Sequence, residues 1–203
     1  MKCNRMGVTL AVLCWLAALP VRAADPDTLR AQEIVAQRCY SCHGPTGLST
    51  TTQFPKLAGQ NVEYLTKQMF NFQSRARRSV VMEEQIAGLT GNEIEALARY
   101  FSRQQITPDP TPDRKLAERG RQLFFNGNPR AGVSACVSCH GPQARGAQML
   151  PRLAGQHATY IERQLQAFIK RARTNDRYKM HMVAKGLTAE DIRAVAYFLS
   201  GLD

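Results

Sequence analysis

The chain contains 203 residues with a formal net charge of +11; 44% of the residues are hydrophobic and 21% are charged. This length corresponds to one domain or two small ones, and the composition is that of a folded globular protein, which excludes a disordered chain. A positive net charge is typical of nucleic-acid-binding proteins. The first residues indicate export, however, which argues against a nucleic acid and favours an acidic protein or an anionic membrane surface as partner.

Residues 1–23 have the pattern of a secretory signal peptide. Lys2 and Arg5 precede an apolar run of twelve residues with a single Thr, and Ala23 ends a small-residue cleavage site. The run is too short to span a membrane, and no later apolar run reaches that length. We therefore expect a soluble periplasmic protein that is cleaved near Ala23. Loss of Lys2, Arg5 and Arg22 lowers the formal net charge from +11 to +8.

The next feature along the chain is the pentapeptide Cys39–His43, which has the pattern C-x-x-C-H and recurs as Cys136–His140. This pattern is the attachment signature of c-type haem. Two thiols three positions apart on a helical turn can reach the two vinyl groups of one porphyrin, and the adjacent His supplies an imidazole to the iron. The sequence therefore predicts two covalently bound haem c groups. The predicted binding residues are Cys39, Cys42 and His43 in the first site and Cys136, Cys139 and His140 in the second.

Two alternatives for the paired cysteines are less consistent with the sequence. Two C-x-x-C pairs could form one four-thiolate zinc site, but that arrangement leaves the His after each second Cys unexplained. A thioredoxin-like redox pair would require a βαβ context, and no strand-like alternation surrounds either motif. Every cysteine that follows the signal peptide belongs to one of the two motifs, so none is left for a structural disulfide.

The remainder of the chain is an internal repeat. The segment Pro55–Gln60 returns as Pro151–Gln156, with only Lys replaced by Arg. Further matching segments at offsets of 96 to 98 residues are Tyr64–Gln68 with Tyr160–Gln164, Arg75–Arg77 with Arg171–Arg173, and Gly88–Thr90 with Gly186–Thr188. So small a drift in the offset indicates one domain that has been duplicated, with short insertions in loops.

The hydrophobic periodicity within each unit is helical. An amphipathic stretch runs into Cys39, and a similar stretch around Leu123 precedes the second motif. Second helices are expected over 62–72 and 160–169. Each final helix should begin at a Thr followed three positions later by an acidic residue, which is close to a capping box. The first and last helices of each unit should cross, and Gly120 would allow a close approach in the second unit.

No segment has the alternation of a strand, so the predicted fold is all-α with two tandem domains. Proline at every second position from 108 to 112 forbids a helix and favours an extended linker. We expect domains over 24–105 and 113–203, with the linker at 106–112. The Gly-, Pro- and Asn-rich segment 126–134 should be a surface loop inserted ahead of Cys136. Each half is marginal for an independent core, and a buried haem would supply apolar interior.

Methionine is the usual partner of His in electron-transfer cytochromes. The mature chain offers five: Met69, Met82, Met149, Met180 and Met182. Alignment through the Gly-Leu-Thr match pairs only Met82 with Met180, each seven residues before the Leu. These two are therefore the predicted sixth ligands, and the alternative for the others is packing in the core.

Two histidines and two prolines complete the candidates. His181 is the main rival of Met180, but it has no counterpart in the first unit and is expected to be exposed. His157 corresponds to Asn61 and is expected on the surface at a helix entry. A backbone carbonyl near Pro55 or Pro151 could accept the second N–H of the ligand imidazole and fix its tautomer and ring plane.

The signal peptide, the two C-x-x-C-H-G motifs, the two P-x-L-A-G-Q segments and the late Met of each unit resemble the di-haem cytochrome c4 family over essentially the whole mature chain. The resemblance implies two class I cytochrome c domains packed around a pseudo-twofold axis, with the haem propionate edges facing each other. It implies that Met82 completes the site of Cys39, Cys42 and His43. It likewise implies that Met180 completes the site of Cys136, Cys139 and His140.

The resemblance also implies electron transport in the bacterial periplasm, often toward terminal oxidases. We therefore expect a carrier of single electrons rather than an enzyme, since two filled axial positions leave no open iron site for substrate chemistry. One alternative is a fixed cytochrome subunit of a periplasmic dehydrogenase or oxidase. Another is a di-haem peroxidase, which requires one iron with a displaceable ligand.

Overall fold

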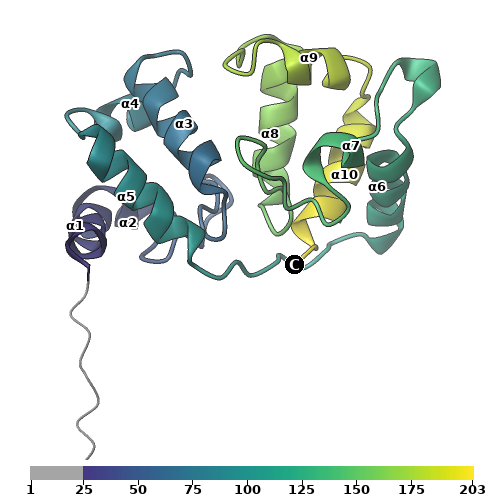
Figure 1. Cartoon of the computed structure of the whole chain (residues 1–203). Coiled ribbons are helices and arrows are strands. Elements are labelled where there is room, and N and C mark those ends of the chain that lie inside the picture. Colours follow the sequence, from purple (N-terminus) through teal and green to yellow (C-terminus); the bar gives the residue numbers. More distant parts are fainter. Residues whose placement is uncertain (1–24) are drawn as a thin grey trace, which may run out of the picture.

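The computed structural model of the chain describes residues 25–203, and its regular elements are helices arranged in two units joined by a single crossing segment (Figure 1). Within this part of the chain β structure is limited to two isolated bridges, Asn128 with Val133 and Ala147 with Leu150. The all-α prediction is therefore confirmed. The predicted signal peptide, residues 1–23, lies outside the described residues.

The first unit begins with α1 (Pro26–Ile34), which continues through one π turn, η1 (Val35–Cys39), into the short helix α2 (Tyr40–His43). Its remaining helices are α3 (Val62–Gln73), α4 (Val80–Ile86) and α5 (Gly91–Ser102). The expected helix at 62–72 is thus confirmed to within one residue. The first C-x-x-C-H motif lies at the C-terminal end of one continuous helical segment.

The second unit contains α6 (Arg114–Asn126), the 3₁₀ turn η2 (Pro129–Ala131), α7 (Val137–His140), α8 (Ala158–Ile169), α9 (Lys179–Ala184) and α10 (Ala189–Ser200). The expected insertion separates α6 from the second motif. It is not entirely a surface loop, because Val133 is only 3% exposed and belongs to the apolar core of this unit.

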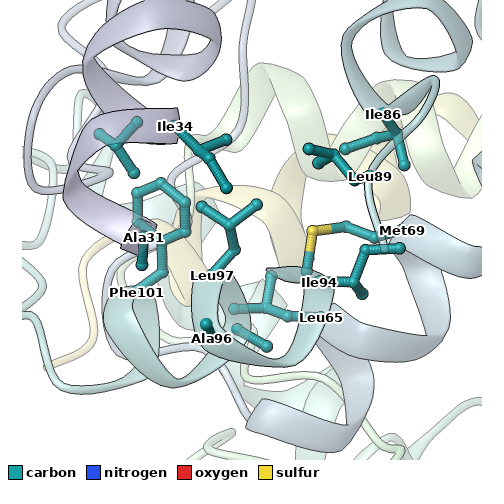
Figure 2. Close-up of a cluster of buried hydrophobic side chains, with 12 residues drawn as sticks. Ala31, Ile34, Leu65, Met69, Ile86, Leu89, Ile94, Ala96, Leu97 and Phe101 are labelled. Atoms are coloured by element: carbon teal, nitrogen blue, oxygen red, sulfur yellow. The ribbon is translucent and has the colours of Figure 1, made fainter. Parts of the chain in front are cut away.

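Each unit has its own apolar core. In the first unit α1 and α3 contribute Ile34, Leu65 and Met69, which pack against Leu97 and Phe101 of α5 (Figure 2). The second core is built in the same way from α6, α8 and α10. Burial of large aliphatic and aromatic side chains contributes roughly 2 kcal/mol each, so each core stabilises the crossing of the first and last helices.

Capping at the last helices follows the sequence prediction. The hydroxyl of Thr90 accepts the N–H of Glu93, whose carboxylate accepts the N–H of Thr90. The same two bonds join Thr188 and Asp191 at the start of α10. These reciprocal bonds satisfy N–H groups that have no partner within the helix.

The segment between the units, residues 103–113, forms no helix or strand, as the spacing of its prolines predicts. It is fastened to the second unit midway, where the N–H of Asp109 donates to the carbonyl of Ser200 at 2.9 Å. This contact draws the segment along the C-terminal end of α10, beside the chain terminus (Figure 1).

Helices α6 and α10 approach each other closely at Gly120. A Cβ atom at this position would collide with the carbonyl oxygen of Ala194 in α10. The corresponding contact in the first unit is made by Ala31, which is fully buried. The second helix pair therefore depends on a residue without a side chain.

Gly120→Ala is expected to destabilise the protein by about 1–3 kcal/mol, because the extra methyl forces α6 away from α10. The measurement is guanidinium unfolding of the holo-protein. Gly91→Ala at the start of α5 is the matched control, since its new Cβ would meet only Phe70, at 3.7 Å. Equal unfolding midpoints for the two variants would show that the close approach is unimportant.

Candidate haem sites

The first thiol of each motif faces the apolar interior. Cys39 packs against the first core and Cys136 against the second. Burial raises the pKa of the Cys39 thiol to about 11 and that of Cys136 to about 11 as well. Of the second thiols, Cys42 is partly buried, as the first thiols are, whereas Cys139 is exposed. Neutral thiols against an apolar wall suit a planar hydrophobic ligand better than they suit a thiolate-bound metal ion.

The histidine of each motif is held by a backbone carbonyl, as expected. Nδ1 of His43 lies 2.9 Å from the oxygen of Pro55, and Nδ1 of His140 lies 3.2 Å from that of Pro151. A carbonyl only accepts, so Nδ1 carries the proton and Nε2 presents its lone pair. Both rings are 6% exposed.

Burial also favours the neutral form of these imidazoles. It lowers the pKa of both His43 and His140, an effect that the Pro carbonyls oppose only in part. A neutral imidazole with a fixed tautomer is the form that binds a metal ion, and the carbonyl bond sets the ring plane. Each motif therefore presents an imidazole prepared for axial ligation of iron.

The two motifs do not form a common metal site. Among residues 25–203 no group of three or more His, Cys, Asp or Glu side chains is close enough to hold a metal ion. Each motif belongs to the core of its own unit. The four-thiolate zinc alternative is therefore not supported by the geometry.

The two methionines predicted as sixth ligands occupy corresponding places. Met82 lies in the first turn of α4, where its N–H donates to the hydroxyl of Ser79. Met180 lies in the first turn of α9, where its N–H donates to Asp176 at 2.6 Å. Met82 packs against the same core as Cys39. Met180 is partly buried as well, and the ligand role of both methionines stays a prediction.

The other methionines are placed less favourably for ligation. Met69 is 8% exposed and forms part of the first core, whereas Met149 and Met182 are 60% and 56% exposed. Met69 therefore has the packing role that is common for this residue type. The structure leaves Met82 and Met180 as the pair with equivalent positions in the two units.

The predictions for the two remaining histidines are wrong. His181 is partly buried, with Nδ1 3.1 Å from the carbonyl of Phe168 and Nε2 accepting from Arg171 at 3.3 Å. His157 is only 4% exposed, because it lies between the two units rather than on the surface. A comparison of His157 with Asn61 alone could not reveal this, since the partners of His157 come from the other unit and the linker.

The two P-x-L-A-G-Q segments bind each other across the interface. The side-chain amide of Gln60 accepts from the N–H of Arg152 at 2.7 Å and donates to its carbonyl at 2.9 Å. Gln156 makes the same two bonds to Lys56, at 2.9 and 2.8 Å. The reciprocal pattern is that of a pseudo-twofold axis. Retention of Gln in both copies was the sequence signal for this role.

A second reciprocal cluster contains two arginines. Arg77 donates to Tyr160 and Gln164 of the other unit, and Arg173 donates to Tyr64 and Gln68. Burial would raise the pKa of Tyr64, but the two guanidinium groups hold it below its ordinary value.

Within residues 25–203 neither Arg77 nor Arg173 forms an ion pair with a carboxylate. A haem brings two propionate carboxylates, and a buried cationic cluster suits such anions. The residues of the two motifs therefore fit the predicted group in the chemistry of their thiols and imidazoles, and Arg77 and Arg173 provide positive charge without a carboxylate partner among the described residues.

Comparison with known proteins decides the family. Residues 117–203 match the family Cytochrome c, and residues 26–101 match Cytochrome C oxidase, cbb3-type, subunit III. Cytochrome c4 of Thiocapsa roseopersicina is 41% identical over 81% of this chain and 86% of its own length. The chain belongs to the cytochrome c4 family. As a cytochrome c4 it carries covalently bound haem c, and two haems fit its tandem domains.

The crystal structure of reduced cytochrome c4 from Pseudomonas stutzeri shares the fold, with a TM-score of 0.81 and 35% identity. The match covers 87% of this chain and 98% of that one. A protein of Thiomonas intermedia named thiosulfate dehydrogenase electron acceptor is 35% identical over 95% of this chain and 87% of its own length. Relatives of this cytochrome c4 thus include a protein named for its electron donor.

Gln156→Ala is expected to lower the free energy of unfolding by about 2 kcal/mol or more, because it leaves the buried N–H and carbonyl of Lys56 without partners. The measurement is chemical unfolding of the holo-protein. Gln53→Ala is the matched control, since the side chain of Gln53 is exposed. A loss no larger than that of the control would show that water replaces the amide without cost.

Proposed function

We propose that this member of the cytochrome c4 family is a periplasmic carrier of single electrons between components of a respiratory chain. It converts no substrate of its own, and the electron acceptor is a terminal oxidase. When bound, each haem would supply a one-electron iron couple. The observation that supports this function most strongly is the duplicated site. Both units present a buried imidazole with its tautomer fixed by a Pro carbonyl, and both place a methionine at the corresponding position.

The proposed binding residues are those of the two motifs and the two methionines. Cys39 and Cys42 would form the thioethers of the first site, with His43 and Met82 as axial ligands. In the second site the same roles fall to the residues Cys136, Cys139, His140 and Met180. Filled axial positions on both irons favour electron transfer over substrate binding, which is the reason to prefer a carrier over a peroxidase.

The proposed localisation and domain limits follow the sequence pattern. We assign residues 1–23 to a signal peptide, 24–105 and 113–203 to the two domains, and 106–112 to the linker. Every helix within residues 25–203 falls short of the length and apolar character that a membrane-spanning helix requires. Export to the periplasm would place the protein where c-type cytochromes meet their redox partners.

The second unit offers a basic surface beside its methionine. Five exposed cations lie in or near α9, and none of them pairs with a carboxylate of residues 25–203: Lys170, Arg171, Arg177, Lys179 and Lys185. Tyr178 and Met182, one helical turn apart, are 50% and 56% exposed among them. A partner with carboxylates around a small apolar patch would complement this surface.

The corresponding surface of the first unit is largely neutralised. Glu83 pairs with Arg78 at 2.9 Å and with Arg75 at 3.5 Å. Glu84 occupies the position that corresponds to Met182 and is also exposed. We therefore propose that an acidic redox partner docks at the second unit rather than the first.

The main alternative is a dedicated partner of one dehydrogenase. Its support is the relative named thiosulfate dehydrogenase electron acceptor, which this chain matches over nearly its whole length. The free carrier and the dedicated partner would use the same two haem sites. Tight co-purification with a periplasmic dehydrogenase would favour the dedicated partner.

Replacing Met82 or Met180 by Ala should make one haem high-spin and remove about half of the near-infrared Met–iron band of the ferric protein, because one of two sulfur ligands is lost. Haem content per chain and the ferric spectrum are the measurements. Met182→Ala is the control and should retain the full band. A full band in Met180→Ala would assign that ligand elsewhere, and peroxide reactivity of the unmodified protein would make it an enzyme.

Reversing two charges on the basic surface, Lys179→Glu with Lys185→Glu, should slow oxidation by ferricyanide by roughly threefold to tenfold at low ionic strength. Stopped-flow kinetics provides the rate. The control reverses two exposed charges of α6, Arg114→Glu with Lys115→Glu, and has the same net charge. An equal decrease in both variants would mean that net charge, and not this surface, governs the encounter.

A further inference from the structure

Three side chains form a cluster where the linker meets both units, outside the two haem sites. One oxygen of Asp109 lies 2.6 Å from Nζ of Lys56, and the other lies 2.6 Å from Nδ1 of His157. Lys56 belongs to the first unit, His157 to the second and Asp109 to the linker. We call Asp109, His157 and Lys56 the linker cluster.

The second ring nitrogen of His157 reaches across the interface. Nε2 lies 3.0 Å from the backbone oxygen of Ser49 in the first unit. The N–H of Ser49 donates to the carbonyl of His43, and its hydroxyl donates to the carbonyl of Cys42. His157 is therefore connected through one backbone residue to the first C-x-x-C-H motif.

Both nitrogens of His157 face atoms that accept hydrogen bonds. The Ser49 carbonyl can only accept, and the Asp109 carboxylate accepts through both oxygens, one of them from the buried ammonium group of Lys56. A neutral imidazole has one N–H and can satisfy only one of these acceptors, whereas an imidazolium satisfies both. The hydrogen bonds to Asp109 and to Ser49 can therefore both form only when both nitrogens of His157 carry protons.

The charges around His157 act in opposite directions. Asp109 from the linker favours the imidazolium. The positive charge of Lys56, which also binds Asp109, disfavours the imidazolium. The positive end of α8 disfavours it as well, since His157 is the N-cap residue of that helix, although its side chain makes no capping hydrogen bond. The Ser49 loop contributes a neutral carbonyl at this point. Direct contact at 2.6 Å makes Asp109 the strongest of these neighbours.

We propose that His157 and Asp109 are positioning residues that hold the two units in the orientation needed for electron exchange between their haems, and that this contact weakens when His157 loses a proton to solvent. The proposal rests on the proposed carrier function. His is the side chain that changes charge in the physiological pH range. The contact is complete at low pH, and one of its two hydrogen bonds is lost as the pH rises.

The first unit provides the internal comparison. Asn61, the counterpart of His157, donates its side-chain N–H groups to the carbonyls of Arg145 and Leu150 in the second unit, at 3.1 and 2.7 Å. An amide makes this contact without titrating. The two crossing contacts are thus equivalent in place, and only one of them depends on pH.

The direct test is ¹⁵N NMR of the histidines in the reduced, diamagnetic holo-protein across the neutral pH range, together with hydrogen exchange at the N–H of Lys56. We expect His157 to be doubly protonated at the acid end and to lose one proton as the pH rises. Exchange at Lys56, corrected for base catalysis, should then increase between about twofold and about tenfold, which corresponds to one hydrogen bond. A single ring proton at every pH would overturn the proposal.

Variants connect the contact with electron exchange. His157→Asn copies Asn61 and should make the inter-haem exchange rate independent of pH, while Asp109→Asn should slow it severalfold at every pH. Both should leave the optical spectra of the two haems unchanged. Asp27→Asn, an exposed carboxylate of the first unit, is the charge-matched control. An unaltered pH profile in His157→Asn would refute the positioning role.

The two parts of the test fail separately. Absence of two low-spin haems would refute the carrier function, whereas the ¹⁵N and exchange measurements report the protonation of His157 and the opening of the interface whether or not electrons are exchanged. A normal carrier with a singly protonated His157 would refute this inference alone.

Discussion

The reciprocal amide bonds of Gln60 and Gln156 are the interaction on which the arrangement of the two units depends. Each side chain satisfies a backbone N–H and a backbone carbonyl of the opposite unit in a region where both glutamines are about 5% exposed. Buried backbone groups need such partners, and water has little access here. The residues bound in this way, Lys56 and Arg152, directly follow Pro55 and Pro151, whose carbonyls orient the motif imidazoles. Each of these loops is therefore held by the neighbouring unit as well as by its own.

Much of this architecture could be predicted from the sequence because it is local. The helices around residues 62–73 and 158–169, the Thr caps and the Pro carbonyl bonds all follow from nearby residue types. The burial of His157 could not be predicted, since its partners are about 50 and 110 residues away in the chain. The core role of Val133 inside a Gly- and Pro-rich loop was hidden for a different reason, because loop composition masks a single anchoring side chain.

The two units share a fold but differ in electrostatics. Glu83 pairs with Arg75 and Arg78 near Met82, whereas the exposed cations near Met180 pair with no carboxylate in the described part of the chain. A duplicated protein with identical halves would present the same surface to every partner. Here the haem environment is repeated and the charge around it is not, which gives the two ends of the molecule different long-range fields.

Binding through main-chain atoms has a consequence for how the duplicated halves could diverge. Gln156 recognises the backbone of position 56 and Gln60 that of position 152, so neither contact constrains the side chain there. One copy could therefore keep a lysine that binds the linker carboxylate, and the other an arginine that bonds within its own loop. An interface that ignores side-chain identity leaves a duplicated gene free to give its two halves different tasks without separating them.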